Sequence, residues 1–208
     1  KIIDAADDFY GLVFCQTKLL VVELTRYLGE HGYKVDCLHG DMSQNDREAT
    51  MARFRTKKVK VVVCTDVAAR GLDVKDLTHV INFSIPRELD SYVHRIGRTA
   101  RSGKTGFAIS LLTPSHRHLL SKIENMTKSR IREGVIPSRK SIASKKIAGV
   151  LPKLLEEKFH GRAIEILDEN WKKAIAEMDS TELAGRFLAM LHPEVFADVG
   201  RPALNQNE

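Results

Sequence analysis

The chain has 208 residues, of which 43% are hydrophobic and 29% are charged, a composition typical of a folded globular protein rather than a disordered one. Its longest apolar runs are far too short to cross a bilayer, so the sequence predicts no membrane-spanning segment and no membrane partner. Cys15, Cys37 and Cys64 lie in apolar runs, which favours reduced thiols in a cytoplasmic protein over a disulfide framework. The spacing of Cys and His residues indicates no metal site.

The formal net charge is +6, and it is unevenly distributed along the chain. Residues 117–146 hold nine Lys or Arg against two Glu, whereas residues 147–208 hold seven basic residues against eleven acidic ones. A basic segment of this kind fits a ligand with a phosphate backbone. A solvated, charged helix face is the simpler alternative, and charge alone does not decide between them.

Short apolar runs alternate with amphipathic segments in the first half of the chain. The runs predict five β-strands, at residues 12–15, 35–38, 59–64, 79–83 and 107–112. Helices are predicted over residues 18–31, where apolar residues recur every three or four positions, and from the N-cap Ser43 to about Arg55. A further helix is expected to begin at Thr113-Pro114. This alternation predicts an α/β fold with a doubly wound parallel sheet.

The pattern changes after about Arg132, and no strand-like run follows it. Two apolar stripes at helical spacing are followed by the sequence Asp179-Ser180-Thr181-Glu182, which resembles a capping box before a third stripe. The tail is therefore predicted to form three helices, with the last dozen residues loose. The predicted domains are an α/β domain over residues 1–132 and an all-α extension over residues 137–208.

A polar segment directly follows the third predicted strand, at the end of a parallel sheet where such folds bind ligands. It contains Thr65, Asp66, Arg70, Gly71 and Asp73. The threonine can bond a phosphate oxygen, the glycine permits close approach of the backbone, and the last carboxylate can accept from a ribose hydroxyl. An ordinary strand–loop–helix connection with a capping Asp explains any one of these residues, but it explains the whole set poorly.

A cationic cluster follows at residues 94–101 and contains His94, Arg95, Arg98 and Arg101. The last two arginines are three positions apart, so they can project on the same side of a helical turn. Two guanidinium groups aimed at one point favour an anion such as a triphosphate. An exposed basic helix is the alternative when this cluster is considered alone.

Four segments together resemble the motifs of the C-terminal RecA-like domain of DEAD-box RNA helicases. Residues 13–18 (VFCQTK) resemble motif IV, residues 44–47 (QNDR) the QxxR element, residues 65–73 motif V and residues 94–101 motif VI. Order and spacing agree over roughly residues 10–130. The last motif begins with His, whereas related helicase families tend to begin it with Gln, which points to the RNA-dependent DEAD-box group.

The resemblance implies a role for each matching residue at a nucleotide. Arg98 and Arg101 would act as arginine fingers on the γ-phosphate of ATP, and Asp73 and Gly71 would contact the nucleotide, the former at its ribose. Three residues would couple the ATP state to the facing domain: His94, Arg95 and Asp66.

The resemblance also implies binding of the RNA sugar–phosphate backbone without readout of the bases. Six residues would lie along it: Thr17, Gly40, Gln44, Arg47, Thr65 and Arg70. The phosphate-cradling loop and the Asp-Glu-Ala-Asp segment, which hold ATP and Mg²⁺ in this family, do not occur in the sequence. An N-terminal RecA-like domain is therefore the expected partner, and the 208 residues alone are expected to be inactive. The full-length protein would unwind or remodel short RNA duplexes.

The tail at residues 137–191 resembles, in position and helical character, a dimerisation module of some bacterial DEAD-box proteins. Five apolar residues are candidates for a homodimer interface: Trp171, Ile175, Leu183, Phe187 and Met190. The alternative is that this stripe covers the core of its own chain. For the chain as a whole, two alternatives remain: a non-enzymatic RNA-binding fragment and a duplex-DNA translocase. Motif VI disfavours the translocase.

Overall fold

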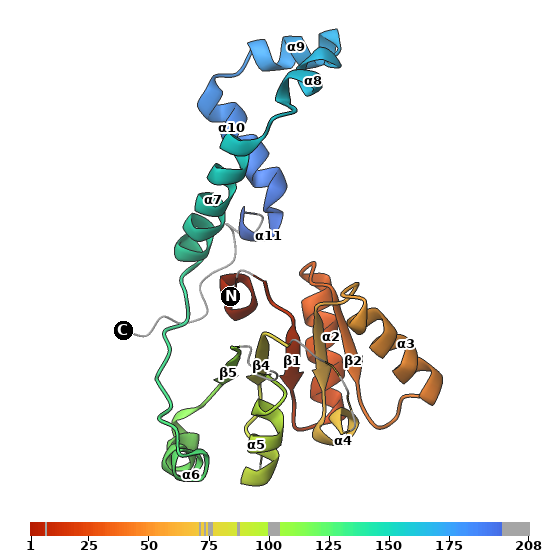
Figure 1. Cartoon of the computed structure of the whole chain (residues 1–208), viewed down its shortest axis with the longest axis vertical. Coiled ribbons are helices and arrows are strands. Elements are labelled where there is room, and N and C mark those ends of the chain that lie inside the picture. Colours follow the sequence, from red (N-terminus) through yellow and green to blue (C-terminus); the bar gives the residue numbers. More distant parts are fainter. Residues whose placement is uncertain are drawn as a thin grey trace. The chain divides into compact units, whose positions relative to one another are not determined.

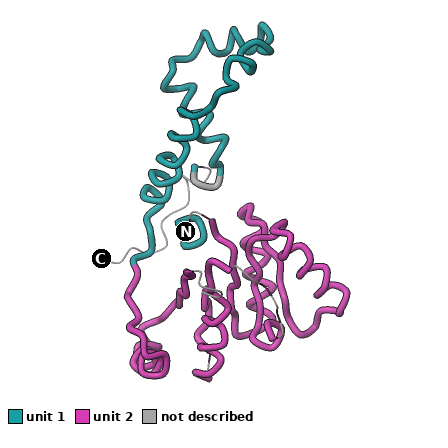
Figure 2. Tube along the Cα trace, in the orientation of Figure 1, with its two compact units in different colours: residues 1–5, 135–208 teal, residues 6–134 magenta. Residues whose placement is uncertain are grey.

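The structure is a computed structural model that describes residues 1–6, 8–70, 72, 74, 77–86, 88–99 and 105–196, and of residues 194 and 195 only the backbone. The chain forms two compact units (Figure 2). Residues 6–134 form one, called the α/β unit below. Residues 1–5 and 135–208 form the other, called the helical unit.

The α/β unit is built on a five-stranded parallel sheet in the order β2-β3-β1-β4-β5 (Figure 1). The strands are β1 (Gly11–Phe14), β2 (Val35–Leu38), β3 (Val61–Cys64), β4 (His79–Asn82) and β5 (Phe107–Ser110). All five strands predicted from the sequence are present, with ends shifted by no more than two residues. The predicted α/β class with a parallel sheet is confirmed.

Two helices cover opposite faces of this sheet. Gly29 of α2 (Lys18–Glu30) lies against Val35, whereas Arg53 of α3 (Gln44–Arg55) binds the side chain of Asp36. Because successive residues of a strand point to opposite faces, α2 and α3 lie on opposite sides of β2. Both helices were predicted from the sequence, and Ser43 caps α3 as expected.

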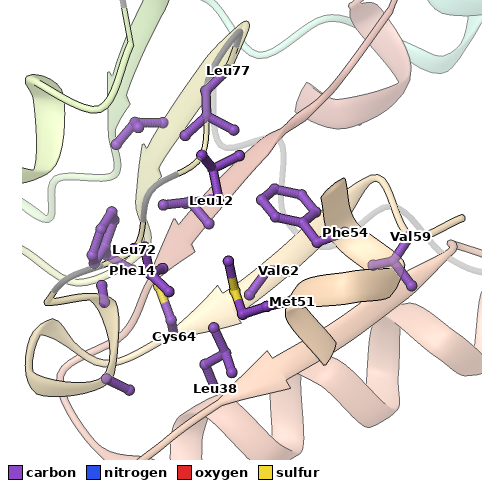
Figure 3. Close-up of a cluster of buried hydrophobic side chains, with 14 of the residues drawn as sticks. Leu12, Phe14, Leu38, Met51, Phe54, Val59, Val62, Cys64, Leu72 and Leu77 are labelled. Atoms are coloured by element: carbon purple, nitrogen blue, oxygen red, sulfur yellow. The ribbon is translucent and has the colours of Figure 1, made fainter. Parts of the chain in front are cut away.

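The main core lies between α3 and the sheet. Leu12 is in register with Val62 on one side and Val80 on the other, and all three are fully buried. Figure 3 shows Met51 and Phe54 of α3 among these strand residues. The three central strands, β1, β3 and β4, are buried along their whole length, which fits the continuous apolar runs of β1 and β3. The outer strands β2 and β5 are only partly buried.

Shorter helices complete the α/β unit. They are α4 (Asp66–Ala69), α5 (Leu89–Ile96), a 3₁₀ turn at Pro114–His116 and α6 (Arg117–Thr127). The helix predicted at Thr113-Pro114 thus begins as a 3₁₀ turn before α6. Ile85, Tyr92 and Ile123 form a second buried cluster that joins α5 to α6.

The described part of the helical unit contains more helices than the sequence predicted. They are α1 (Ile2–Ala5), α7 (Arg139–Glu156), α8 (His160–Glu165), α9 (Glu169–Ala176), α10 (Ser180–Leu191) and α11 (Pro193–Phe196). The prediction of three tail helices was wrong, because the described tail holds five. One of the extra helices is α11, which begins at Pro193, and the other arises because Asp168 divides the second stripe. Its side chain accepts a hydrogen bond from the Trp171 amide and so starts α9 as a separate helix. The predicted cap at Asp179 is confirmed, because its carboxylate accepts from the amides of Thr181 and Glu182.

None of the helices in the described ranges combines the length and the apolarity that crossing a bilayer requires.

Candidate functional site

Three predicted RNA contacts lie at one edge of the sheet. The strands β1, β2 and β3 end level with one another, because the last residues of β1 and β2 both pair with Cys64. Thr17, Gly40 and Thr65 follow these three ends within three residues. A Cβ built on Gly40 would meet nothing within 4 Å, so the backbone at this point is open to close approach. The parallel topology therefore brings together residues that are far apart in the sequence.

The same edge carries the N-termini of helices. The Thr17 hydroxyl accepts a hydrogen bond from the Leu20 amide at 3.2 Å and caps α2, which has 13 residues. The Ser43 hydroxyl accepts from the Asp46 amide at 3.1 Å and caps α3, which has 12 residues. Unsatisfied amides and the helix dipole make such ends favourable for phosphate groups. Both helices thus present partial positive charge at the edge that the predicted RNA contacts occupy.

An ion pair that the sequence did not reveal joins two of these loops. Lys18 Nζ lies 2.5 Å from Asp41 Oδ2, and both side chains are exposed. The hydrogen bond from Lys18 lowers the pKa of the Asp41 carboxyl, so this carboxylate is ionised at neutral pH. Lys18 directly follows Thr17, and Asp41 directly follows Gly40. In the sequence, this ion pair was indicated only by the fact that each of its residues adjoins a predicted RNA contact.

Gln44 is exposed at the start of α3, where its amide donates to the Glu48 carboxylate at 2.7 Å. His94 is exposed near the end of α5, and Arg70 is exposed just after α4. Each of these side chains is accessible from solvent at the position where the sequence predicts a contact.

Arg95 is more deeply buried than Arg98, the other described arginine of its motif, because only 1% of the Arg95 surface is exposed. Its Nε and Nη2 donate to the two carboxylate oxygens of Asp66 at 2.6 and 2.8 Å. Its Nη1 donates to the Asn82 side chain at 3.0 Å and to the Ser84 carbonyl at 2.6 Å. The guanidinium also lies over the Phe14 ring, 4.9 Å from its centroid. Arg95 therefore ties the start of α4 to α5 within the α/β unit.

Arg98 and Arg47 approach the loop that follows α4. Arg98 Nη1 donates to the Leu72 carbonyl at 2.9 Å. Arg47 Nη2 donates to the carbonyls of Ala68 and Arg70 at 2.6 and 3.2 Å. Both guanidinium groups therefore contact neutral carbonyl oxygens, so these contacts leave their positive charges unneutralised.

Three predicted nucleotide contacts, Gly71, Asp73 and Arg101, lie outside the described residues. Within the described ranges, no group of three or more His, Cys, Asp or Glu is placed to hold a metal ion. Cys15 and Cys64 are buried free thiols close to Arg95, and burial raises the pKa of Cys15 to about 12.

Comparisons with known proteins agree with this architecture. Residues 2–103 match the model of the helicase conserved C-terminal domain. The RNA helicase CrhR of Synechocystis is 40% identical over 193 residues, which are 93% of this chain and 39% of that protein. The chain therefore spans about two-fifths of the length of this relative. A match over so much of the chain must include part of the helical unit.

Two solved structures resemble the α/β unit. The Escherichia coli DEAD-box protein SrmB, bound to the regulator of ribonuclease activity A, is 41% identical with a TM-score of 0.59, over 63% of this chain and 78% of that one. Domain 2 of the DEAD-box helicase Mss116p, bound to an RNA duplex, is 30% identical with a TM-score of 0.56, over 66% of this chain and 56% of that one. With its parallel RecA-like sheet and its four motifs in order, the chain belongs to the DEAD-box helicase family and carries the C-terminal RecA-like domain.

Proposed function

We propose that this chain is the second half of the catalytic core of an ATP-dependent RNA helicase, which unwinds or remodels short RNA duplexes. The observation that carries the proposal is the carboxyl edge of the sheet. There the N-termini of α2 and α3 lie beside Thr17, Gly40 and Thr65. The partial positive charge of the helix N-termini and the open backbone at Gly40 favour binding of a sugar–phosphate chain. Neither feature distinguishes one base from another.

In this proposal the RNA backbone crosses the edge from the start of α2 to the loop after α4. Six residues contact it: Thr17, Gly40, Gln44, Arg47, Thr65 and Arg70. The relative Mss116p supports RNA binding by this domain, because its domain 2 is described as bound to an RNA duplex.

The proposed nucleotide is ATP, and the described residue that fits it best is Arg98. Its guanidinium donates to a neutral carbonyl, so its charge is available to a phosphate group. In the proposal Arg98 and Arg101 stabilise the negative charge on the transferring γ-phosphoryl group, while Asp73 and Gly71 contact the nucleotide. Binding of Mg²⁺ is assigned in this proposal to the N-terminal RecA-like domain, because the Asp-Glu-Ala-Asp segment that holds the metal in this family does not occur in the sequence.

Closure of two domains around ATP and RNA would complete such a site. Arg95 and Asp66 support this proposal as a rigid joint between the two motifs that face the nucleotide. Because two of the four hydrogen bonds of Arg95 go to Asp66, a shift of the start of α4 would move α5 with it in this proposal. His94, exposed on the same helix, is the group proposed to reach the facing domain.

RNA binding by this chain is tested most simply by fluorescence anisotropy with single-stranded RNA, duplex RNA and duplex DNA. Tight binding of single-stranded RNA that weakens with salt and does not depend on sequence is the expected result. Preference for duplex DNA would instead favour a translocase. Absence of RNA binding at low salt would refute the proposed RNA surface.

The helical unit is proposed to mediate homodimerisation through residues 137–191. Trp171, Phe187 and Met190 are 49%, 44% and 72% exposed, which leaves large apolar side chains in contact with water. Ile175 and Leu183, which lie one helical turn from Trp171 and Phe187 respectively, are half-buried. Such side chains are enriched at protein interfaces, and an exposed apolar patch needs a partner.

Light scattering on the whole chain and on a version that ends at Ile136 tests the dimer. A dimer that becomes a monomer on truncation is expected. A monomer in both cases would assign the apolar stripe to support of its own chain.

A further inference from the structure

A basic patch on the α/β unit lies outside all of the predicted motifs. Residues 117–132, which form α6 and the segment after it, hold five Lys or Arg against one acidic residue, Glu124. These residues are called the α6 patch below. Its five cations are all exposed: Arg117, Lys122, Lys128, Arg130 and Arg132. The residues proposed above to contact RNA or the nucleotide do not include any of them.

The cations of the α6 patch form no ion pair with a carboxylate of the described residues. Elsewhere in the α/β unit, Lys18, Arg53 and Lys60 each pair with an aspartate. Glu124 binds the backbone instead, because its Oε1 accepts a hydrogen bond from the Ile131 amide at 2.8 Å. Positive charge without ion-pair partners on one surface attracts polyanions and raises their local concentration.

The α6 patch rests on packed side chains. Ile123 of α6 is buried with Ile85 and Tyr92, and Ile131 packs against the same cluster. The bond from the Ile131 amide to Glu124 closes the turn between α6 and the segment after it. Arg130 and Arg132 are exposed on either side of the anchored Ile131. The fold therefore displays these cations on a defined surface.

Lys128 ends α6 in a left-handed conformation, with φ 52° and ψ 28°. Glycine is the usual residue at such a position, because a side chain is strained there. Among the described residues Lys57 is the other non-glycine residue with positive φ, and its ammonium lies 5.3 Å from the centroid of the Tyr10 ring. The Lys128 side chain makes no hydrogen bond, ion pair or ring contact with a described residue. A strained residue of this kind is a candidate for a functional role.

We propose that the α6 patch is a second contact for the sugar–phosphate backbone of RNA, separate from the one formed by the predicted motifs. This inference rests on the proposed function, because it extends the RNA surface of the same unit. RNA fits better than an acidic protein, since Met126 is the one large apolar side chain of the patch that is more than a third exposed. Protein interfaces need apolar or aromatic anchors, whereas phosphate groups are bound by Lys and Arg alone.

The α6 patch and the motifs lie at different parts of the sheet. Thr17, Gly40 and Thr65 follow β1, β2 and β3, whereas α6 follows β5, at the other end of the sheet from β2 (Figure 1). The strands β1 to β3 span two spacings, about 10 Å, and β5 lies about 10 Å beyond β1. With one phosphate per about 3.4 Å of a strand, an RNA of about five nucleotides covers the motif contacts, whereas one of about 20 nucleotides also reaches the patch.

The test removes two charges from the patch with Lys122→Gln and Lys128→Gln together. The matched control is Lys34→Gln together with Lys58→Gln, two exposed lysines that lie just before β2 and β3, at the opposite edge of the sheet. Fluorescence anisotropy on the whole 208-residue chain measures affinity for both RNA lengths at several salt concentrations.

The patch variant is expected to bind the long RNA at least about fivefold more weakly than the wild type does. Its slope of log K against log salt becomes shallower by about 1.4, which is about 0.7 for each lost contact with a single strand. Its binding of the short RNA, and both affinities of the control, are expected to match the wild type. Equal losses with both lengths would overturn the proposal, because they indicate a general effect of charge. Unchanged binding of the long RNA would also overturn it and leave the patch to solvent or to an acidic protein.

Lys128→Gly separates binding from folding. Glycine relaxes the left-handed backbone, so the melting temperature is expected to equal or exceed that of the wild type while affinity for the long RNA falls. A lower melting temperature with unchanged affinity would contradict the proposal, because it assigns Lys128 to the C-terminal dipole of α6.

The two RNA lengths also distinguish this inference from the proposed function. Failure of the wild-type chain to bind the short RNA would refute the proposed contacts at the motifs. Wild-type binding of the short RNA, with no further gain in affinity for the long one, would refute the α6 patch alone.

Discussion

The two units of the chain differ in where their apolar side chains lie. In the α/β unit, Leu12, Val62 and Phe54 are fully buried between the sheet and α3. In the described part of the helical unit Ile142 is the one residue that is fully buried, whereas Leu154, Leu155 and Ile166 are more than half exposed. The first unit has a core of its own, whereas the described part of the second leaves large apolar side chains exposed, as the proposed dimer requires.

This difference predicts opposite results for the same substitution in the two units. Phe54→Ala is expected to destabilise the α/β unit by about 4 kcal/mol, because it removes a buried ring and leaves a cavity. Phe187→Ala in α10 is expected to leave that stability unchanged and to weaken dimerisation at least about tenfold. Urea unfolding and sedimentation equilibrium measure the two effects. A loss of stability with Phe187→Ala and no change in dimerisation would place this ring in a core.

Charged pairs sharpen the comparison within the α/β unit. Arg95→Met is expected to cost about 3 kcal/mol of unfolding free energy, because it leaves Asp66 and Asn82 without their donors. Part of the cost is relieved, since 35% of the Asp66 side chain is exposed to water. The matched control Arg53→Met breaks a more exposed pair with Asp36 and is expected to cost less than about 1 kcal/mol. Equal effects in urea unfolding would contradict this difference in burial.

Smaller effects of opposite sign on RNA affinity are expected at the carboxyl edge of the sheet. Lys18→Gln removes a cation beside Thr17 and is expected to weaken RNA binding about two- to fivefold. Asp41→Asn removes an ionised carboxylate and releases Lys18, so it is expected to strengthen binding by a similar factor. Anisotropy titrations at low salt compare the two. A change in the same direction would place this pair away from the RNA.

The smallest effect concerns pH and the N-terminal edge of the sheet. His79 lies between Phe9 and Phe107, with ring centroids 4.8 and 5.2 Å away, and burial lowers its pKa. Below its ordinary pKa of about 6.5 the unfolded chain therefore binds a proton that the folded chain resists, so stability falls as pH drops. His79→Phe is expected to flatten this part of the stability profile in urea unfolding. A profile identical to that of the wild type would assign the pH dependence to other groups.

Much of the fold was predictable from the sequence because its signals are local. Val61, Val62 and Val63 form a buried β-branched run, and Ser43 and Asp179 are caps with their partners two or three residues away. The number of tail helices was not predictable in the same way. There an apolar stripe at helical spacing continued across Asp168, whose capping bond interrupts the helix.

The location of three proposed RNA contacts at one edge of the sheet was predictable from the sequence, but the hydrogen bonds of the arginine side chains were not. The parallel sheet brings Thr17, Gly40 and Thr65 to one edge, as the alternation of strands and helices implied. The bonds of Arg47 and Arg98 reach carbonyls 21 to 26 residues away in the sequence. Such contacts depend on how α3 and α5 pack beside the end of α4. Residue spacing along the chain does not predict this packing.

The most direct test of the proposed function is phosphate release by this chain mixed with the N-terminal RecA-like half of the same protein. We expect ATP hydrolysis that requires both halves and RNA, and that falls at least about a thousandfold in Arg98→Ala. The exposed Arg55→Ala variant serves as the control and is expected to hydrolyse ATP at the wild-type rate. Hydrolysis that does not depend on RNA, or that survives Arg98→Ala, would contradict the assignment of this edge as the second half of an RNA-stimulated ATPase.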